Sequence, residues 1–70
     1  MSLSVTINGD RRELPAGVTV ASMIASLPGA TDGRGVAVAV DGEVVPRAQW
    51  PSVELRDGAK VEVVVAVQGG

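Results

Sequence analysis

The sequence contains no cysteine, histidine, tyrosine or phenylalanine, and Trp50 is its only aromatic residue. Without cysteine there is no disulfide framework, and without cysteine and histidine the chain lacks the side chains on which most zinc sites depend. Nucleophile and base pairs are also missing, because the serines have no histidine to activate them. We therefore do not expect an autonomous enzyme, a metal site or a bound cofactor.

The chain also lacks an excess of charge and a long hydrophobic run. Six basic and eight acidic residues give a formal net charge of −2, and the two signs are interspersed. Nucleic acids and anionic membranes select basic surfaces, so neither is an expected partner. The apolar run VVVAV is far too short to span a bilayer, and MSLSVTI at the start has no signal-peptide pattern. We expect a soluble, cytoplasmic monomer.

The residues that are present favour a small sheet built largely of valine, a β-branched residue that packs well on a pleated surface. Seventy residues leave room for one domain. Residues 3–8, LSVTIN, alternate between apolar and polar, which is typical of a half-buried strand. Asn8 and Gly9 tolerate the positive φ of a tight turn, so residues 11–14, RREL, are expected to return antiparallel.

Residues 19–29, TVASMIASLPG, have the spacing of an amphipathic helix, with apolar residues at i, i+3, i+4 and i+7. Thr19 is the expected N-cap, because its hydroxyl can accept a free amide of the first turn, and Pro28 with Gly29 provides the stop. Residues 29–35, GATDGRG, are expected to be a plain loop, because the context of a phosphate-binding loop is missing. The apolar helix face consists of Val20, Met23, Ile24 and Leu27.

A second hairpin is predicted from VAVAV at 36–40 and EVV at 43–45, joined by an Asp-Gly pair at 41–42 that is typical of a type I′ turn. Residues 46–55, PRAQWPSVEL, are expected to be irregular, because their two prolines cannot donate to a sheet ladder. Trp50 is the only large ring in an aliphatic domain, so we expect it to close one end of the core.

The last strand is predicted at residues 60–67, KVEVVVAV, after a turn at 57–58. It begins with charges on one face and then becomes apolar on both faces, as a central strand does. Because side chains alternate along a strand, every second residue is expected on the core face. These are Val61, Val63, Val65 and Val67.

The elements therefore follow the order hairpin, helix, hairpin, irregular crossing and strand, which is an α+β pattern. A single helix must cover a single sheet, because its apolar stripe has nothing else to bury against. This is the element pattern of the β-grasp (ubiquitin-like) fold, a mixed sheet of four to five strands covered by one helix. We expect the β-grasp domain at residues 1–67 and a flexible tail at residues 68–70.

The sequence ends in AVQGG, where Gln68 leaves the last strand and is followed by Gly69 and Gly70. Glycine loses more conformational freedom on ordering than any other residue, so it suits a thin, flexible thread. The α-carboxylate of Gly70 is the one reactive group that remains, an anion at neutral pH that can attack the α-phosphate of a nucleotide held by another protein. A sulfur nucleophile could then displace AMP from the acyl adenylate.

The sequence contains NG after the first strand, VTV at the helix start, VAVAVDGEVVPRAQW, and LRDGAKVEVVVAVQGG. Together these stretches resemble the ThiS family, the sulfur carriers of thiamin biosynthesis. Ubiquitin-like proteins in general share the terminal Gly-Gly, including the small subunit of molybdopterin synthase, whereas the spacing of Pro46, Arg47 and Trp50 is similar to the thiamin branch. Ala59 departs from the family, which often has an acidic residue after the turn glycine, and we expect Ala59 at the surface.

The resemblance implies a protein cosubstrate and parallel pairing of the first and last strands. A ThiF-type adenylating enzyme would use ATP and Mg to activate Gly70, and a sulfurtransferase or a cysteine-derived persulfide would supply sulfur. The thiocarboxylate would then deliver that sulfur to a ThiG-type thiazole synthase for the thiazole ring of thiamin. Two alternatives remain open: a carrier like the small subunit of molybdopterin synthase, and a non-catalytic β-grasp interaction module.

A partner-docking surface is predicted on the sheet face away from the helix. If the odd-numbered valines of the last strand face the core, Val64 and Ala66 face outward, and Ala37 and Ala39 of the preceding hairpin do the same. Together they would form an apolar patch close to the tail, where we expect the activating and acceptor enzymes to dock. Arg47 is a further candidate, as a partner contact or as a loop anchor.

Overall fold

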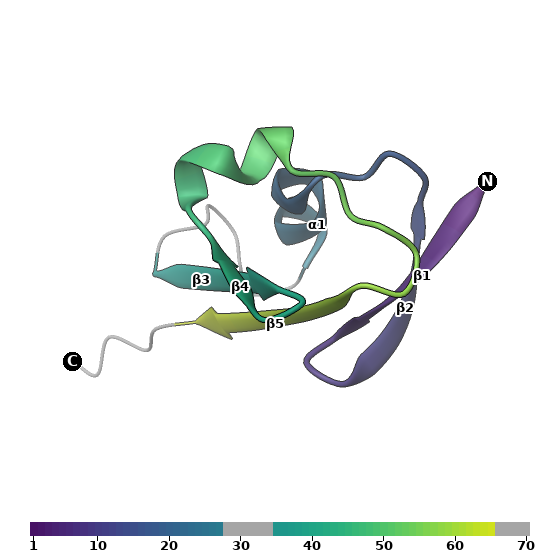
Figure 1. Cartoon of the computed structure of the whole chain (residues 1–70), viewed down its shortest axis with the longest axis horizontal. Helices are drawn as coiled ribbons and strands as arrows, with labels where there is room; N and C mark the ends of the chain where they lie inside the picture. Colours follow the sequence, from purple (N-terminus) through teal and green to yellow (C-terminus); the bar gives the residue numbers. More distant parts are fainter. Residues whose placement is uncertain (28–34, 66–70) are drawn as a thin grey trace.

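The computed structural model describes residues 1–27 and 35–65. In this part of the chain, five strands form one mixed sheet in the order β2-β1-β5-β3-β4, and α1 lies across one face of it (Figure 1). The elements are β1 Ser2–Ile7, β2 Asp10–Pro15, α1 Val20–Ser26, β3 Val36–Val40, β4 Glu43–Val45, the 3₁₀ helix η1 Arg47–Ser52, and β5 Lys60–Val65. The predicted α+β architecture of a sheet covered by one α-helix is confirmed.

The first hairpin forms as its alternation and its turn predict. Leu3, Val5 and Ile7 of β1 are buried beneath α1, and β2 pairs antiparallel along the full length of β1. The turn residues Asn8 and Gly9 have φ values of 52° and 86°. These are left-handed conformations that Asn and Gly adopt with little penalty, so the turn chemistry alone explains where the chain reverses.

α1 begins and ends close to its predicted limits. The Thr19 hydroxyl oxygen accepts a hydrogen bond from the Ser22 amide at 3.1 Å, which satisfies a free donor of the first turn. Val20 and Met23 are fully buried and Ile24 is 3% exposed, so the apolar face packs on the sheet. The predicted loop at residues 29–35 lies outside the described residues except for Gly35.

The second hairpin is also confirmed, with Asp41 at φ 50° and Gly42 at φ 84°. The expectation that residues 46–55 are irregular is wrong for Arg47–Ser52, which form η1. Pro46 precedes the helical turn with φ −58°, a value that suits a helix start, where a missing amide costs nothing. Trp50 supplies the packing: it is 5% exposed, and its indole Nε1–H donates to the Val45 carbonyl at 2.9 Å. It belongs to the core, as expected.

β5 is the central strand, as the sequence predicts, and it pairs in parallel with β1 and antiparallel with β3. Val61 is fully buried and Val63 is half-buried, but Val65 is 48% exposed. Val65 thus lies on the same face as Ile7 and Val63, as the alternation predicts, but it is largely uncovered; Val67 lies outside the described residues. α1 has seven residues and spans about 10 Å, whereas the six residues of β5 span about 20 Å, so the helix does not cover the strand's end.

Ala59 corrects a further expectation, because it is 3% exposed and belongs to the core. The turn at Gly58, with φ 86°, has already brought the chain into the sheet, where the Thr6 amide donates to the Ala59 carbonyl at 3.0 Å. Counting back by two from buried Val61 places Ala59 on the same inner face. The described part of β5 ends at Val65, so the domain boundary between residues 67 and 68 stays a prediction.

Candidate functional site

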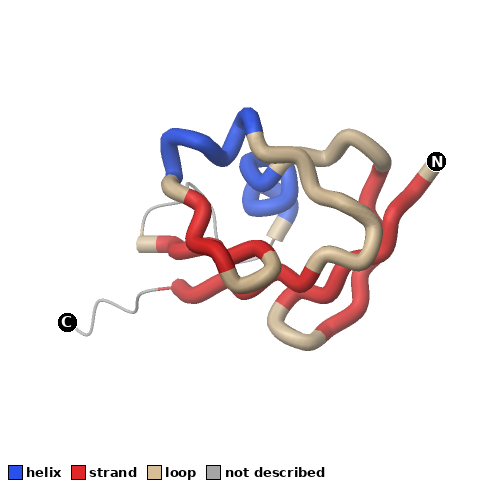
Figure 2. The backbone as a smooth tube through the Cα atoms, viewed as in Figure 1, coloured by secondary structure: helices blue, strands red, loops and turns tan. Residues whose placement is uncertain are grey.

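The sheet face away from α1 carries an apolar patch towards the end of β5. Strand pairing places Ala37 opposite Val64 and Ala39 opposite Val44. Val64 is 64% exposed and Val44 is 75% exposed, while Ala37 is exposed and Ala39 is half-buried. We call these four residues the outer patch. They form two neighbouring cross-strand pairs, and Glu62 of β5 lies on the other side of Ala39. Figure 2 shows both helical segments on the opposite side of the sheet.

Sequence reasoning missed Val44, the most exposed member of the outer patch. The signal was present, because a two-residue turn at 41–42 fixes the register of the hairpin and so sets Val44 beside Ala39. Ala66, which was predicted to belong to this patch, lies outside the described residues. The geometry therefore places Val64, Ala37 and Ala39 together and adds Val44.

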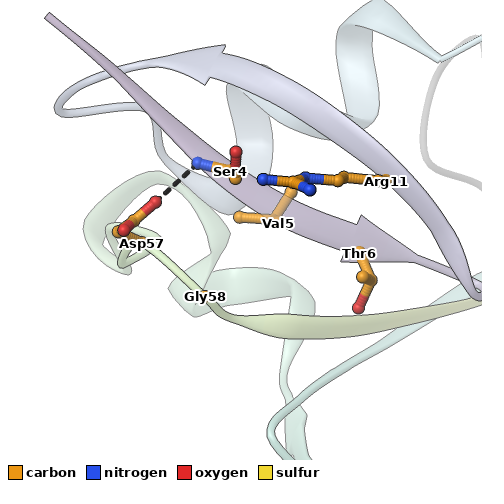
Figure 3. A pocket seen from close by; sticks show the side chains of 6 residues that line it. All are labelled: Ser4, Val5, Thr6, Arg11, Asp57 and Gly58. Carbon is orange, nitrogen blue, oxygen red and sulfur yellow. Dashed lines mark hydrogen bonds between the residues drawn. The ribbon is translucent and has the colours of Figure 1, made fainter.

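The other half of the outer face is polar and contains a shallow hollow of about 390 Å³. Figure 3 shows Arg11 of β2 on one side of it and Asp57 on the other, with Ser4 and Thr6 of β1 between them. The Asp57 carboxylate accepts a hydrogen bond from the Ser4 amide at 2.7 Å, and the Gly58 amide donates to the Ser4 carbonyl at 2.6 Å. These contacts fasten the turn before β5 to β1.

Two residues in the hairpin turns form hydrogen bonds to β5, one at each edge of the strand. Asp41 donates its amide to the Lys60 carbonyl at 2.7 Å, and its carboxylate accepts from the Lys60 amide at 2.9 Å. Asn8 uses its side-chain amide to make two hydrogen bonds to the main chain of Val63, at 2.8 and 2.9 Å. The strand that leads towards the predicted tail is therefore fixed at both of its edges.

The remaining predicted site residues do not join the outer patch. Arg47 is exposed and opens η1, which lies on the side of the sheet that carries α1 (Figure 2). Gln68, Gly69 and Gly70 lie outside the described residues, so their role in the tail stays a prediction.

The described residues present surfaces rather than a reactive centre. Within residues 1–27 and 35–65, no group of three or more acidic, histidine or cysteine side chains could hold a metal ion. In the same ranges every buried side-chain nitrogen or oxygen has a hydrogen-bond partner, and no helix has the length and apolar character needed to cross a membrane. What this arrangement can do chemically is present a sheet face, and the strand end beside it, to a partner.

The strand order, the parallel central pair and the single covering helix define a β-grasp protein of the ubiquitin-like class. Comparison with known proteins supplies the family. The model of the ThiS family matches residues 5–70, which is nearly the whole chain. The chain therefore belongs to the ThiS family, whose members are small sulfur carrier proteins of thiamin biosynthesis.

Two relatives illustrate this similarity. The chain is 35% identical over 68 residues to a thiazole synthase of Paramagnetospirillum magneticum (strain ATCC 700264 / AMB-1), a match that covers 97% of this chain but only 20% of that protein's length. It is 27% identical to the thiamine biosynthesis protein (ThiS) from Geobacter metallireducens, whose crystal structure superposes with a TM-score of 0.78 and a coverage of 97% of this chain and 100% of that one.

Proposed function

We propose that this protein carries sulfur as a thiocarboxylate at Gly70 and delivers it for formation of the thiazole ring of thiamin. The observation that carries the proposal is the family match, which extends through the C-terminal Gly-Gly to residue 70. Because the sequence contains no cysteine and no histidine, the α-carboxylate is the group best suited to covalent activation. The protein acts as a cosubstrate, and its partners supply the catalysis.

The proposed chemistry begins when a ThiF-type adenylating enzyme binds ATP and Mg. An oxygen of the Gly70 carboxylate attacks the α-phosphate, and pyrophosphate leaves, which produces an acyl adenylate. A persulfide on a sulfurtransferase or another cysteine-derived donor then attacks the acyl carbon and displaces AMP, forming an acyl disulfide. A thiol reduces the S–S bond, which releases the Gly70 thiocarboxylate and leaves the donor as a disulfide.

The acceptor in this proposal is a ThiG-type thiazole synthase. Support comes from the relative in Paramagnetospirillum magneticum, a thiazole synthase in which a segment similar to this chain makes up 20% of the protein. A carrier-like segment in the same polypeptide would raise the effective concentration of the one for the other. We propose that the separate proteins meet in the same way, through a docking surface and a tail.

The outer patch is the proposed docking surface for both enzymes. It is apolar, it lies on the sheet face opposite the described helices α1 and η1 (Figure 2), and Val64 lies four residues before Gln68, where the tail is predicted to begin. A partner that buries this patch would hold the domain while the tail enters the active site. Docking through the sheet leaves the core and α1 undisturbed.

The decisive experiment is intact-mass spectrometry after incubation with ATP, Mg, the adenylating enzyme and a sulfur donor. The expected product carries one sulfur in place of one oxygen, located by fragmentation at the C-terminus. A second carrier of the same family, shown to be modified in parallel, establishes that the enzymes are competent. An unmodified mass under those conditions would contradict the proposal.

Deleting Gly70 separates the proposal from its alternatives. A sulfur carrier loses all function in this variant, because the reacting carboxylate is displaced, whereas a non-covalent β-grasp interaction module keeps its binding. Genetic rescue then separates the two carrier branches. Rescue of a thiazole auxotroph is expected, and rescue of molybdenum-cofactor deficiency instead would assign the chain to the molybdopterin branch.

A further inference from the structure

The side chain of Asn8 makes contacts that its place in a turn does not require. Its Nδ2 donates to the Val63 carbonyl at 2.9 Å, and its Oδ1 accepts from the Val63 amide at 2.8 Å. The backbone amide of Asn8 also donates to the Val61 carbonyl at 2.9 Å. Asn8 therefore contacts two successive inner-face positions of the strand that leads to the C-terminus.

These contacts extend the sheet beyond the end of β1. The parallel register sets Ile7 beside Val61, and after Ile7 the chain turns away through Asn8, whose φ is 52°. A carboxamide offers the same donor and acceptor as a peptide group, so the Asn8 side chain takes the place of the next β1 peptide. Val38 of β3 lies opposite Val63 on the other edge of β5, but the N–H and C=O of one strand residue face the same edge, and those of Val63 face Asn8. Asn8 therefore supplies both main-chain hydrogen bonds of Val63.

Asp41 is the counterpart of Asn8 at the opposite end of β5. It has a similar φ of 50° and also bonds the strand with both its backbone and its side chain, but it does so at Lys60. The two hairpin turns thus form hydrogen bonds to different residues of β5. Asp41 holds the residue with which β5 begins, and Asn8 holds Val63, two residues before the last described residue of the strand.

We propose that Asn8 is a positioning residue for the sulfur-carrying terminus, an inference that rests on the proposed role of Gly70. Seven residue steps separate Val63 from Gly70, a distance of at most about 25 Å in an extended chain. By bonding the main chain of Val63, Asn8 fixes the point and direction from which that chain sets out. When these bonds to Val63 are lost, only a fraction of the free carriers aims the terminus correctly, so apparent affinity for the partner falls by that fraction.

The simpler explanation of Asn8 is that a residue with positive φ is needed in the turn. Glycine adopts positive φ even more readily than asparagine, so Asn8→Gly keeps the turn and removes only the side-chain bonds. Asp41→Gly is the matched control, since it makes the same change in the other hairpin and releases a side-chain bond at the start of β5. Both variants are compared where circular dichroism shows them folded.

Two measurements test the proposal. In amide hydrogen exchange, Asn8→Gly is expected to speed exchange at Val63 by about tenfold, the factor for one net hydrogen bond, and Asp41→Gly is expected to act at Lys60 instead. In adenylation kinetics with the carrier as the varied substrate, Asn8→Gly is expected to raise KM by about tenfold with kcat unchanged. Asp41→Gly is expected to leave KM within about twofold. Asn8→Asp, which keeps the acceptor and loses the donor, should fall between wild type and Asn8→Gly.

Unchanged exchange at Val63 in Asn8→Gly would overturn the proposed anchor, and equal KM values for the two glycine variants would overturn the positioning role while leaving sulfur carriage intact. Wild-type protein that is never adenylated by a competent enzyme would instead overturn the proposed function, and the positioning role with it. Adenylation of the wild-type protein thus distinguishes failure of the positioning role from failure of the proposed function.

Discussion

Replacing Val64 with glutamate should separate folding from partner docking. Complete burial of a valine side chain is worth about 1.5–3 kcal/mol, and 64% of Val64 is still exposed in the free domain. A partner that covers it can therefore gain about 1–2 kcal/mol. Val64→Glu removes this gain and places an unpaired carboxylate in the contact, which costs about 1–3 kcal/mol more. Because 1.4 kcal/mol corresponds to a factor of ten, the sum predicts a fall in kcat/KM for adenylation of about 30- to 3,000-fold.

The assay measures the initial rate of adenylate formation against carrier concentration, together with urea denaturation of each variant. Val64→Glu should lose less than about 1 kcal/mol of unfolding free energy, because the side chain is on the solvent face of the sheet. Ala25→Glu is the matched control. Ala25 is exposed on α1, on the opposite side of the sheet (Figure 2), so it adds the same charge away from the outer patch.

A Val64→Glu protein that is folded and adenylated at the wild-type rate would refute the docking argument. An equal loss in Ala25→Glu would refute it as well, because the effect would then follow net charge rather than the outer patch. Loss in Val64→Glu alone supports docking through the sheet.

Two further predictions concern stability. Trp50→Phe should lower the unfolding free energy by about 2–4 kcal/mol in urea denaturation, because it leaves the Val45 carbonyl without its indole donor and opens space in the core; a loss below 1 kcal/mol would show that the ring is dispensable there. Thr19→Ala should cost about 1 kcal/mol by removing the N-cap of α1, and Thr19→Ser, which keeps the hydroxyl, should restore most of it.

The outer patch and the Asn8 contact suggest two separate roles in the carrier, partner binding and orientation of the terminus. The sheet face offers apolar area to a partner, and the turn of the first hairpin steadies the strand from which the terminus emerges. In the proposed docking, the outer patch determines how strongly the partner binds the domain. The proposed role of Asn8 is to raise the fraction of free carriers whose terminus is aimed correctly before they bind, which is why its variants are expected to change KM and not kcat.

The local features of this fold could be predicted because their causes are local. Asn8 and Gly9, like the Asp-Gly pair at 41–42, are the residue types that accept positive φ, so the turns fix both hairpins and their registers. Thr19 caps α1 through a bond to a residue three positions away. The same reasoning predicted the alternation of β1 and the central place of β5, because residues 60–67 begin with charges on one face and then become apolar on both faces.

The proposal that Gly70 carries the sulfur also comes from the sequence alone. It rests on the absence of other reactive side chains, on the terminal Gly-Gly and on the family resemblance. No distance or burial in the folded domain enters that argument. The parallel pairing of β1 with β5 was implied by the resemblance, because the alternation of a strand does not state which neighbour it has.

Tertiary structure decided the features that depend on what lies across the sheet. Val65 has the same alternation as Val61, yet it is 48% exposed, because a seven-residue helix ends before it. Ala59 is buried because the turn before it has already brought the chain into the sheet. The 3₁₀ helix η1 forms because Trp50 packs in the core. The second use of Asn8 belongs here too. Its turn conformation is written in the local sequence, but its bonds to Val63, 55 residues away along the chain, exist only because folding brings the last strand beside the first.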